Sequence, residues 1–424
     1  MKPLFLHSNR RKIAVSLFAI LWFLLWMFLV LGTNIEWQRF SLLALTLGLG
    51  FSDYRKGQLV LKPMRQIRPA LLFVIFLSAL CVFAVAWLLI EQHSLRTVRN
   101  WSSFCIIGLG AVRYLGWRSF KLTIFSICSG IILSALILVL HVHFPQLIFL
   151  KLDYDLENAR LALFMESPND LGAMAGWGCV VWFFLHFNKK HLFKFHLDWL
   201  LLLILAVPLF LSGSRANMIG TLAIVIFMGL SMPRFSLKKT LLTGVALIIS
   251  ILVIHQLPEP DNPQLGRVVS ALKAPHKDRT FISRLPLWEI SWRGYLQSPL
   301  YGNGLKSYTR LHKEMLQQHG AEFREKYPIV ETNMHRAHNM ILGVMTDMGT
   351  IGLILFIGMY ASGIVAAWRV PAPFKIGLPV LLFYLVAGLV DCILYETWRT
   401  LILFSACGGT LAGYFVQPDR EFTP

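Results

Sequence analysis

Long runs of apolar residues, separated by short polar segments, recur along the whole of this 424-residue chain. Runs of about 20 such residues are long enough to cross the hydrocarbon core of a bilayer as helices. The pattern predicts twelve membrane spans, at residues 13–31, 36–52, 70–90, 100–116, 119–141, 169–187, 197–212, 216–231, 240–256, 350–368, 376–391 and 399–416. Two of them, at 197–212 and 216–231, are short and adjacent, which indicates a tight helical hairpin. We therefore predict an all-α polytopic membrane protein.

One polar segment is much longer than the others and lies between the ninth and tenth predicted spans. It begins as a proline-rich coil and then places apolar residues at three- and four-residue spacing over 288–296 and 308–319. This spacing predicts two amphipathic helices, and the sequence YGNG at 301–304 predicts a turn between them. The chain is thus expected to divide into nine spans, a helical loop domain and three further spans, over 1–256, 257–337 and 338–424.

Lysine and arginine are unevenly distributed between the two sides that these spans define. With both termini in the cytoplasm, the short inner segments carry 21 of these residues and the short outer segments carry seven. Short loops rich in lysine and arginine remain on the cytoplasmic side of a membrane. The charge pattern therefore predicts cytoplasmic termini and a long loop outside the cytoplasm.

The overall composition agrees with a membrane protein and narrows the choice of partners. The chain is 56% hydrophobic and 15% charged, and its formal net charge is +18. In a membrane protein such a basic excess indicates cytoplasmic loops and contact with anionic lipid head groups, so we do not expect nucleic acid as a partner. None of the six cysteines lies in the long loop, which argues against a disulfide framework or a zinc site. The apolar run at 13–31 is long enough to stay as a span, so no removable signal peptide is expected.

Four polar stretches at predicted outer span ends are candidates for chemistry, because charges at membrane depth are costly. The first is LSGSRANMIG at 211–220, which places Arg215 in the turn of the short hairpin. Small neighbours allow a ligand to approach the backbone, and the helix beginning near Ala216 directs its positive end to the same place. Arg215 is thus a candidate phosphate ligand. The alternative is an interfacial arginine that reaches out to lipid head groups.

The second stretch, 284–304, contains Arg284, Trp288 four residues later, and a G-x-G sequence at 302–304. Alone, G-x-G is a weak signal and the tryptophan indicates a core or interfacial anchor. Arg284 and Arg293 considered in isolation indicate a solvated helix face. This stretch gains meaning only in combination with the others.

The third stretch, HRAHNMILGVMTDMG at 335–349, precedes the tenth predicted span. If the chain is helical from residue 338, His338 shares a face with Leu342 and Gly349. A neutral imidazole is suited to accepting a proton from a hydroxyl, although a single histidine is more often structural. His335 and His338 would also share a helix face, but two histidines make half a zinc site at most.

The fourth stretch, 152–172, contains two carboxylates and an amide. Asp153 and Asp155 could hold a divalent ion for a pyrophosphate leaving group, or simply belong to a solvated loop. Asn169 is a candidate helix cap or ligand contact. At another outer rim, Asp391 and Glu396 could orient an arginine or a histidine.

Taken together, these stretches predict an outer-leaflet site with several cationic side chains and one imidazole. Such a site suits an anionic, lipid-linked substrate. Arginines can match the charge that develops on a departing pyrophosphate by bidentate hydrogen bonds, without a metal ion.

The order of three motifs resembles that of the bacterial O-antigen ligases. The motifs are the Ser-Arg turn between two short spans, R-x-x-x-W at 284–288 with P-x-x-G-x-G at 299–304, and H-N-x9-G-x-x-G at 338–352. The resemblance covers the whole chain in its twelve-span layout, whereas the motifs are confined to 211–352. The related O-antigen polymerases share this layout and some of the motifs.

This resemblance implies a GT-C-like membrane glycosyltransferase of the bacterial inner membrane. Such ligases transfer O-antigen from undecaprenyl pyrophosphate to a sugar hydroxyl of lipid A-core at the periplasmic face, with inversion and without metal or other cofactor. Carried over to this sequence, Arg215 and Arg284 bind the pyrophosphate and His338 activates the acceptor hydroxyl. Three further residues are supporting candidates: Asp391, Asn169 and Asn339.

Two other functions remain open. An O-antigen polymerase differs only in using a second undecaprenyl-linked glycan as the acceptor. A transporter or flippase would place charged residues near the midplane of its spans and would contain broken helices there. The charged residues of this chain gather instead at predicted span ends and in the long loop.

Overall fold

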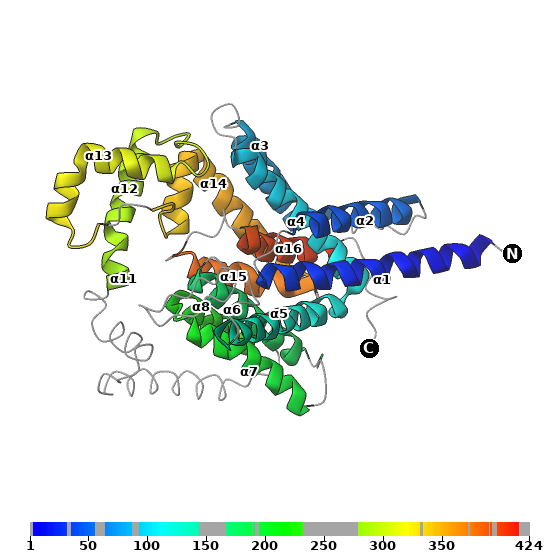
Figure 1. Cartoon of the computed structure of the whole chain (residues 1–424). Helices are drawn as coiled ribbons and strands as arrows, with labels where there is room; N and C mark the ends of the chain where they lie inside the picture. Colours follow the sequence, from blue (N-terminus) through cyan, green and yellow to red (C-terminus); the bar gives the residue numbers. More distant parts are fainter. Residues whose placement is uncertain are drawn as a thin grey trace.

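The structure is a computed structural model that describes residues 3–31, 35–55, 64–86, 93–143, 167–188, 190, 195–231, 279–330, 334–371, 374–389, 391 and 397–414. Within these ranges every regular element is helical, so the predicted all-α class is confirmed for the described part. Figure 1 shows the helices in chain order. The helices ahead of the loop domain are α1 (Pro3–Val30), α2 (Glu36–Arg55), α3 (Met64–Ala86), α4 (His93–Leu115), α5 (Trp117–His143), α6 (Pro168–Phe187), α7 (Phe195–Leu211) and α8 (Arg215–Ser231).

The loop domain contributes three described helices, and the C-terminal part contributes three more together with a short 3₁₀ turn. Those of the loop domain are α11 (Arg279–Ile282), α12 (Arg284–Gln297) and α13 (Tyr308–Lys326). Those that follow are α14 (Met340–Arg369), the 3₁₀ turn η4 (Phe374–Ile376), α15 (Gly377–Ala387) and α16 (Thr397–Ala412).

Five described helices are long and apolar enough to cross a membrane, which supports a multi-pass membrane protein. They cover Arg11–Val30, Ile67–Ala86, Trp117–Ile137, Pro168–Phe187 and Met340–Arg369. Shorter apolar helices cover Asp198–Leu211, Arg215–Gly229, Phe374–Ala387 and Arg399–Ala412. Helices α2 and α4 occupy two further predicted spans, while the predicted span at 240–256 lies outside the described residues. The number of twelve spans stays a prediction, as does the division of the chain at residues 256 and 337.

The C-terminal helices form the centre of the bundle. α16 packs along α4, and α14 packs along α3. A Cβ atom at Gly108 or Gly408 would overlap the backbone of Ser405 or Cys105, so the backbones of α4 and α16 approach very closely. Small residues permit this kind of close contact between membrane helices.

The predicted hairpin of two short helices is present as α7 and α8, joined by a turn in which Gly213 has a φ of 60°. Its two helices do not pack mainly on each other. Each makes its larger contact with α6, which the structure places against both of them. The hairpin therefore holds the first turn of α6 close to the turn that precedes Arg215.

Ion pairs show which helix ends lie on the same side of the bundle. At one end, Asp53 of α2 is paired with Arg113 of α4 at 3.0 Å and with Arg11 of α1 at 3.3 Å. At the other end, Glu36 of α2 is paired with Arg99 of α4 at 3.0 Å. These two groups correspond to the inner and outer ends expected from the lysine and arginine pattern. Which of the two faces the cytoplasm stays a prediction.

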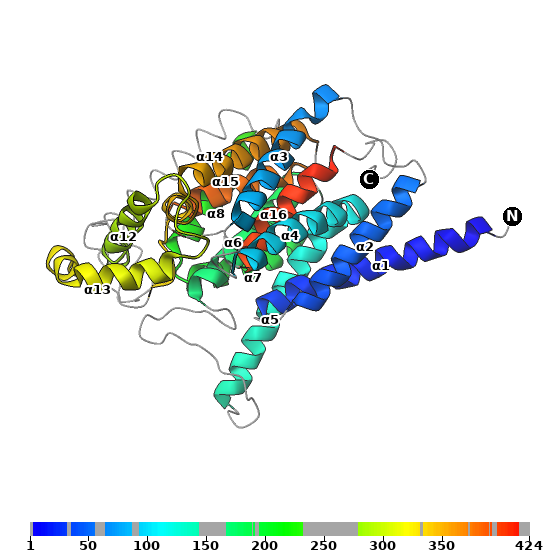
Figure 2. The ribbon, with the colours of Figure 1, turned by 90° about the horizontal axis from the view of Figure 1, so that it is seen from above.

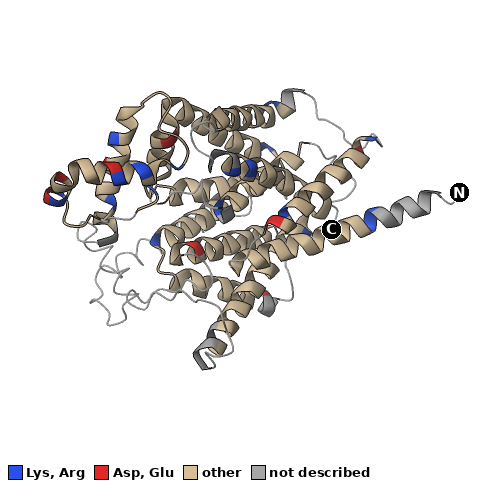
Figure 3. Ribbon diagram, turned by 45° about the horizontal axis from the view of Figure 1, so that its top comes forward, with Lys and Arg blue, Asp and Glu red and all other residues tan. Residues whose placement is uncertain are grey.

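Helices α12 and α13 lie at the opposite end of the molecule from the start of α1, as Figures 1 and 2 both show. Both predicted amphipathic helices are present. α13 continues beyond the predicted end at 319 to Lys326, after a kink at which His319 has a φ of −126°. A small separate core, with Ile290, Tyr308 and Phe323 among its members, holds the two helices together. Charged residues are frequent along α13, whereas long stretches of the described bundle carry none (Figure 3).

Candidate active site

His338 lies immediately before α14 and not on it. Its backbone is left-handed, with a φ of 49°, and the next residue, Asn339, caps the helix. The Asn339 side-chain oxygen accepts a hydrogen bond from the Leu342 N–H at 3.0 Å, which satisfies one of the free donors at a helix start. The expectation that His338 shares a helix face with Leu342 and Gly349 is therefore wrong. Asn339 is the cap residue, so the helix begins after it and His338 lies outside the helix.

The segment that carries His338 is attached to the end of α15. The Met340 N–H donates to the Gly388 carbonyl at 2.7 Å, and the Asn339 side-chain amide donates to the Leu389 carbonyl at 3.0 Å. These bonds bring His338 next to Asp391, with 3.4 Å between His338 Nδ1 and Asp391 Oδ1. Asn339 thus has a structural role in this arrangement, which it performs as a helix cap and as a clamp on α15.

Asp391 is buried and has a second cationic neighbour. Its Oδ2 lies 2.5 Å from Nη1 of Arg399, at the start of α16. The two oxygens of Asp391 thus lie beside an arginine and a histidine, which is consistent with the predicted role of orienting one of these side chains. That role stays a prediction.

Arg399 extends this group of charges to α6. Its Nη2 lies 2.8 Å from Oδ1 of Asp170, which is in the first turn of α6 behind the cap residue Ser167. The preceding residue, Asn169, contributes its main-chain carbonyl, which accepts a hydrogen bond from the Asn217 side chain at 3.0 Å. The start of α6 thus joins Arg399 to the turn between α7 and α8.

That turn holds Arg215, a half-buried residue at the start of α8. The prediction of a helix N-terminus at this place is confirmed. The Ser212 hydroxyl accepts a hydrogen bond from the Ser214 N–H at 3.2 Å, and the Asn217 amide donates to the Ser214 hydroxyl at 2.7 Å. A continuous series of contacts therefore connects His338, through both aspartates and Arg399, to the turn that presents Arg215.

Arg284 begins α12 and is half-buried in the loop domain, which contacts the bundle through α14. Main-chain hydrogen bonds between the P-x-x-G-x-G segment and α14 form this contact. The Asn303 N–H donates to the Thr346 carbonyl at 2.9 Å, and the Thr350 N–H donates to the Pro299 carbonyl at 2.8 Å. The G-x-G turn therefore packs on α14. Convergence of Arg284 and Arg215 on one phosphate stays a prediction.

Comparison with known protein families gives a match for the segment that carries Arg215, Arg284 and His338. Residues 200–357 match the model of the family described as O-antigen ligase. This segment is similar to an O-antigen ligase domain. No curated protein matches the chain significantly. Together with the apolar helices, this similarity supports a multi-pass membrane protein related to those of lipopolysaccharide biosynthesis.

His335 and His338 do not pair with each other. His335 is exposed, and its Nδ1 lies 3.4 Å from the Thr309 hydroxyl. The expected common helix face of His335 and His338 is wrong, because this segment is not helical. Among the described residues, no group of three or more histidine, cysteine, aspartate or glutamate side chains is placed to hold a metal ion. Asp153, Asp155 and Glu396 lie outside the described residues.

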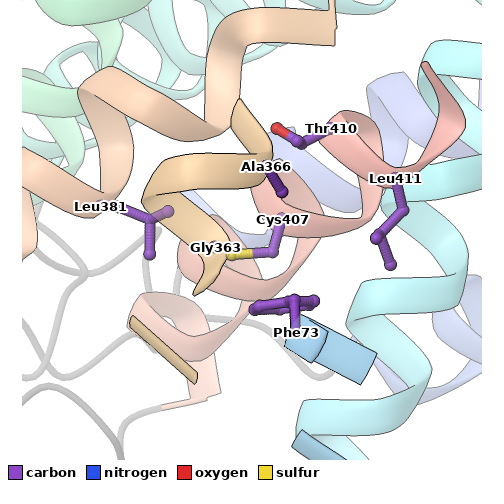
Figure 4. Close-up of a pocket in the computed structure, with 7 residues that line it drawn as sticks. All are labelled: Phe73, Gly363, Ala366, Leu381, Cys407, Thr410 and Leu411. Atoms are coloured by element: carbon purple, nitrogen blue, oxygen red, sulfur yellow. The ribbon is translucent and has the colours of Figure 1, made fainter. Parts of the chain in front are cut away.

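A small pocket of the bundle lies away from these charges. It is a shallow depression between α3, α14, α15 and α16, with Phe73, Cys407 and Leu411 in its wall (Figure 4). Its residues on α14 and α16 come from the second halves of these helices, whereas His338 and Arg399 are at their starts. The wall carries no charged side chain, so the pocket is unsuited to a pyrophosphate.

Two members of the charged network, Arg399 and Asp170, were not anticipated as site residues. The sequence pattern counted Arg399 only as an outer cation, and it singled out Asn169 but not Asp170. One signal was available: residues of opposite charge occur in the first turns of two apolar segments that begin on the same side. A pairing across 229 positions of sequence could not be inferred from it.

Proposed function

We propose that this protein is an O-antigen ligase that transfers O-antigen from undecaprenyl pyrophosphate to a sugar hydroxyl of lipid A-core. The reaction takes place at the periplasmic face of the bacterial inner membrane, inverts the anomeric centre and needs no metal ion. The observation that carries the proposal is the contact of His338 with the buried carboxylate of Asp391, within a chain whose central segment matches the O-antigen ligase family.

His338 acts as the general base in this proposal. A carboxylate at 3.4 Å from Nδ1 favours the tautomer that carries its proton there, which leaves the lone pair of Nε2 to accept the proton of the acceptor hydroxyl. The His338 side chain is 21% exposed, enough for a substrate to reach it. The acceptor oxygen then forms its bond to the anomeric carbon while the bond to pyrophosphate breaks on the opposite side. This single displacement accounts for inversion.

Arg215 and Arg284 stabilise the leaving group. Pyrophosphate gains negative charge as its bond to the sugar breaks, and guanidinium groups bind such oxygens in a bidentate manner. The N-terminus of α8 adds its positive end at Arg215. One well-placed donor of this kind is worth roughly 3–4 kcal/mol in the transition state, so loss of either arginine should cost about a hundredfold or more in rate.

The expected topology belongs to the same proposal. Twelve spans of GT-C-like arrangement with cytoplasmic termini put the loop domain, residues 257–337, in the periplasm. There Arg284 approaches the membrane surface from the periplasmic side, and Arg215 and His338 lie at the outer ends of spans. The lipid-linked donor and lipid A-core both present their sugars at this level.

The test is a reaction of the purified protein with undecaprenyl-pyrophosphate glycan and lipid A-core in the presence of EDTA. We expect product with the unaltered protein and none with His338→Ala or Arg215→Ala. His335→Ala is the matched control and should retain activity, because His335 is exposed and its Nδ1 lies beside the Thr309 hydroxyl. Full activity of His338→Ala would refute the role of general base, and dependence on a metal ion would refute the metal-free mechanism.

The same reaction distinguishes the alternative functions. A second reaction omits lipid A-core and supplies another undecaprenyl-linked glycan. If the protein is a ligase, the lipid-linked chains should not grow in this mixture. Longer lipid-linked chains in that mixture would identify an O-antigen polymerase. Movement of labelled lipid-linked glycan across vesicles without any product would identify a transporter.

A further inference from the structure

Arg399 bridges two carboxylates from distant parts of the chain. Nη1 lies 2.5 Å from Asp391 and Nη2 lies 2.8 Å from Asp170, so the two ends of one guanidinium are each committed to a different partner. The side chains of Arg399, Asp391 and Asp170 are 3%, 9% and 2% exposed, so water screens none of these interactions. The planar guanidinium therefore fixes both the distance and the angle between the carboxylates.

Stability is a weak explanation for such a group. Removing charges from water costs so much that a buried ion network often stabilises a fold no better than apolar residues of similar volume would. One end of this network is in contact with His338, whose Nδ1 is 3.4 Å from Asp391.

The geometry divides the two oxygens of Asp391 between two neighbours. Oδ2 is bound by Arg399 and Oδ1 faces His338. With Oδ2 fixed, the carboxylate cannot rotate away from the imidazole. Asp170 in turn holds the other end of Arg399, and the residue before it, Asn169, is bonded to Asn217 beside the turn of Arg215.

We propose that Arg399 and Asp170 are positioning residues that hold Asp391, and through it His338, in the orientation required for proton transfer. This inference rests on the function proposed above. Neither residue touches the substrate. Their role is to fix the position of the imidazole relative to the turn that presents Arg215.

The experiment compares kcat and KM of purified variants in the ligase reaction. Arg399→Lys keeps a positive charge, but a single ammonium group cannot hold two carboxylates in a fixed geometry. We expect kcat to fall by about tenfold to a hundredfold, since misplacement by 1 Å can cost about a hundredfold, while KM for the lipid-linked donor stays within about twofold. Asp170→Asn is nearly isosteric and should lower kcat in the same way but less.

A matched control separates positioning from stability. Arg113 is a buried arginine that binds Asp53 at the opposite end of the bundle, and Asp53 also contacts Arg11. Arg113→Lys should lower the thermal unfolding midpoint about as much as Arg399→Lys does and leave kcat unchanged. Equal losses of kcat in the two variants would overturn the proposal.

A double variant tests the route through Asp391. In an Asp391→Asn background, Arg399→Lys should produce little further loss, because the carboxylate that it positions is already gone. A loss as large as in the unaltered background would overturn the proposal. If Arg399→Lys fails to accumulate in the membrane, Asp170→Asn decides alone, and wild-type kcat in that variant contradicts the proposal. Full activity of His338→Ala would remove the proposed function itself, whereas inactive His338→Ala with fully active Arg399→Lys would remove only this inference.

Discussion

A single glycine interrupts α14 within the motif that begins at His338. Gly349 has a φ of 62° and a ψ of −162°, a region that residues with a side chain almost never adopt. A Cβ atom there would also lie 2.5 Å from the carbonyl carbon of Leu300. The first glycine of G-x-x-G is thus required by the backbone, and it lets the loop domain approach the membrane helix.

Gly349→Ala should consequently destabilise the protein. A strained backbone of this kind costs about 1–3 kcal/mol, and the overlap with Leu300 adds to it. The measurement is the thermal unfolding midpoint in detergent, with Gly48→Ala as the control. Gly48 lies in α2 with no atom within 4 Å of an added Cβ, so alanine there should be neutral or slightly stabilising. Equal midpoints for the two variants would contradict this account.

At the residue scale, the sequence indicated which side chains are candidates for the site but not the backbone conformation of the segment that carries them. His338 was singled out by the order of motifs, and Asp391 lies in contact with both His338 and Arg399, while the roles of these residues stay predictions. The backbone conformation of His338 was missed, because the competition between helix and cap at Asn339 is decided by bonds to α15. The bridge formed by Arg399 was missed as well, since ion pairing across the bundle leaves no local pattern.

One carboxylate adds polar contacts to the core that holds α12 and α13 together. Glu289 of α12 accepts hydrogen bonds from Lys326 at 2.6 Å and from Tyr327, at the end of α13, and also pairs with Arg293. Burial favours the protonated acid, but these donors outweigh it and lower the pKa of Glu289 to about 2. The ionised form of Glu289 therefore strengthens the contact between α12 and α13.

The stability of the loop domain should fall in acid for this reason. A carboxyl group with a depressed folded-state pKa contributes stability that is complete above its unfolded value of 4.5 and is lost as the pH falls toward 2. We expect Glu289→Gln to remove this pH dependence and to lower stability at pH 7. Unfolding curves recorded from pH 7 to pH 3 measure both effects. Glu325→Gln, at an exposed position of α13, should keep the acid sensitivity, and the same pH dependence in Glu289→Gln would exclude the mechanism.

Amphipathic spacing was a good guide to these elements. It predicted α12, α13 and the turn between them, and it ended the second helix at 319, where α13 kinks. It did not predict the continuation to Lys326. That last segment is retained because Phe323 is buried against the loop-domain core, and the kink shifts the spacing by which a continuous helix is recognised.

The orientation of the whole molecule can be tested with single cysteines. Gln318 is an exposed residue of α13, and Tyr54 is 70% exposed near the end of α2 at the other end of the bundle. In intact cells a membrane-impermeant maleimide that crosses the outer membrane should label Gln318→Cys at once and Tyr54→Cys only after the inner membrane is permeabilised. The unaltered chain gives the background from its native cysteines. The reverse labelling pattern would invert the predicted topology and place His338 in the cytoplasm.

Hydrophobicity located the membrane helices well but did not indicate their depth in the bundle. Each predicted span within the described part coincides with a helix. The span of α6 has a mean hydropathy of 1.3 and is 83% buried by other helices, whereas that of α3 has 2.7 and is 33% buried. Lipid and protein are equally apolar surroundings, so an apolar sequence does not reveal which of them covers a helix. Contacts such as that of α4 with α16 therefore had to come from the structure.

The Arg399 bridge sets a limit on how such enzymes can be recombined. The segment that matches the family ends at residue 357, so it includes Arg215, Arg284 and His338 but neither Asp170 nor Asp391 nor Arg399. A chimera that exchanges only this segment between relatives would take His338 from one protein and Asp391 and Arg399 from another. Exchanges that preserve the reaction should carry the start of α6 and the start of α16 along with it. The proposed positioning role thus extends the functional unit beyond the segment that matches the family.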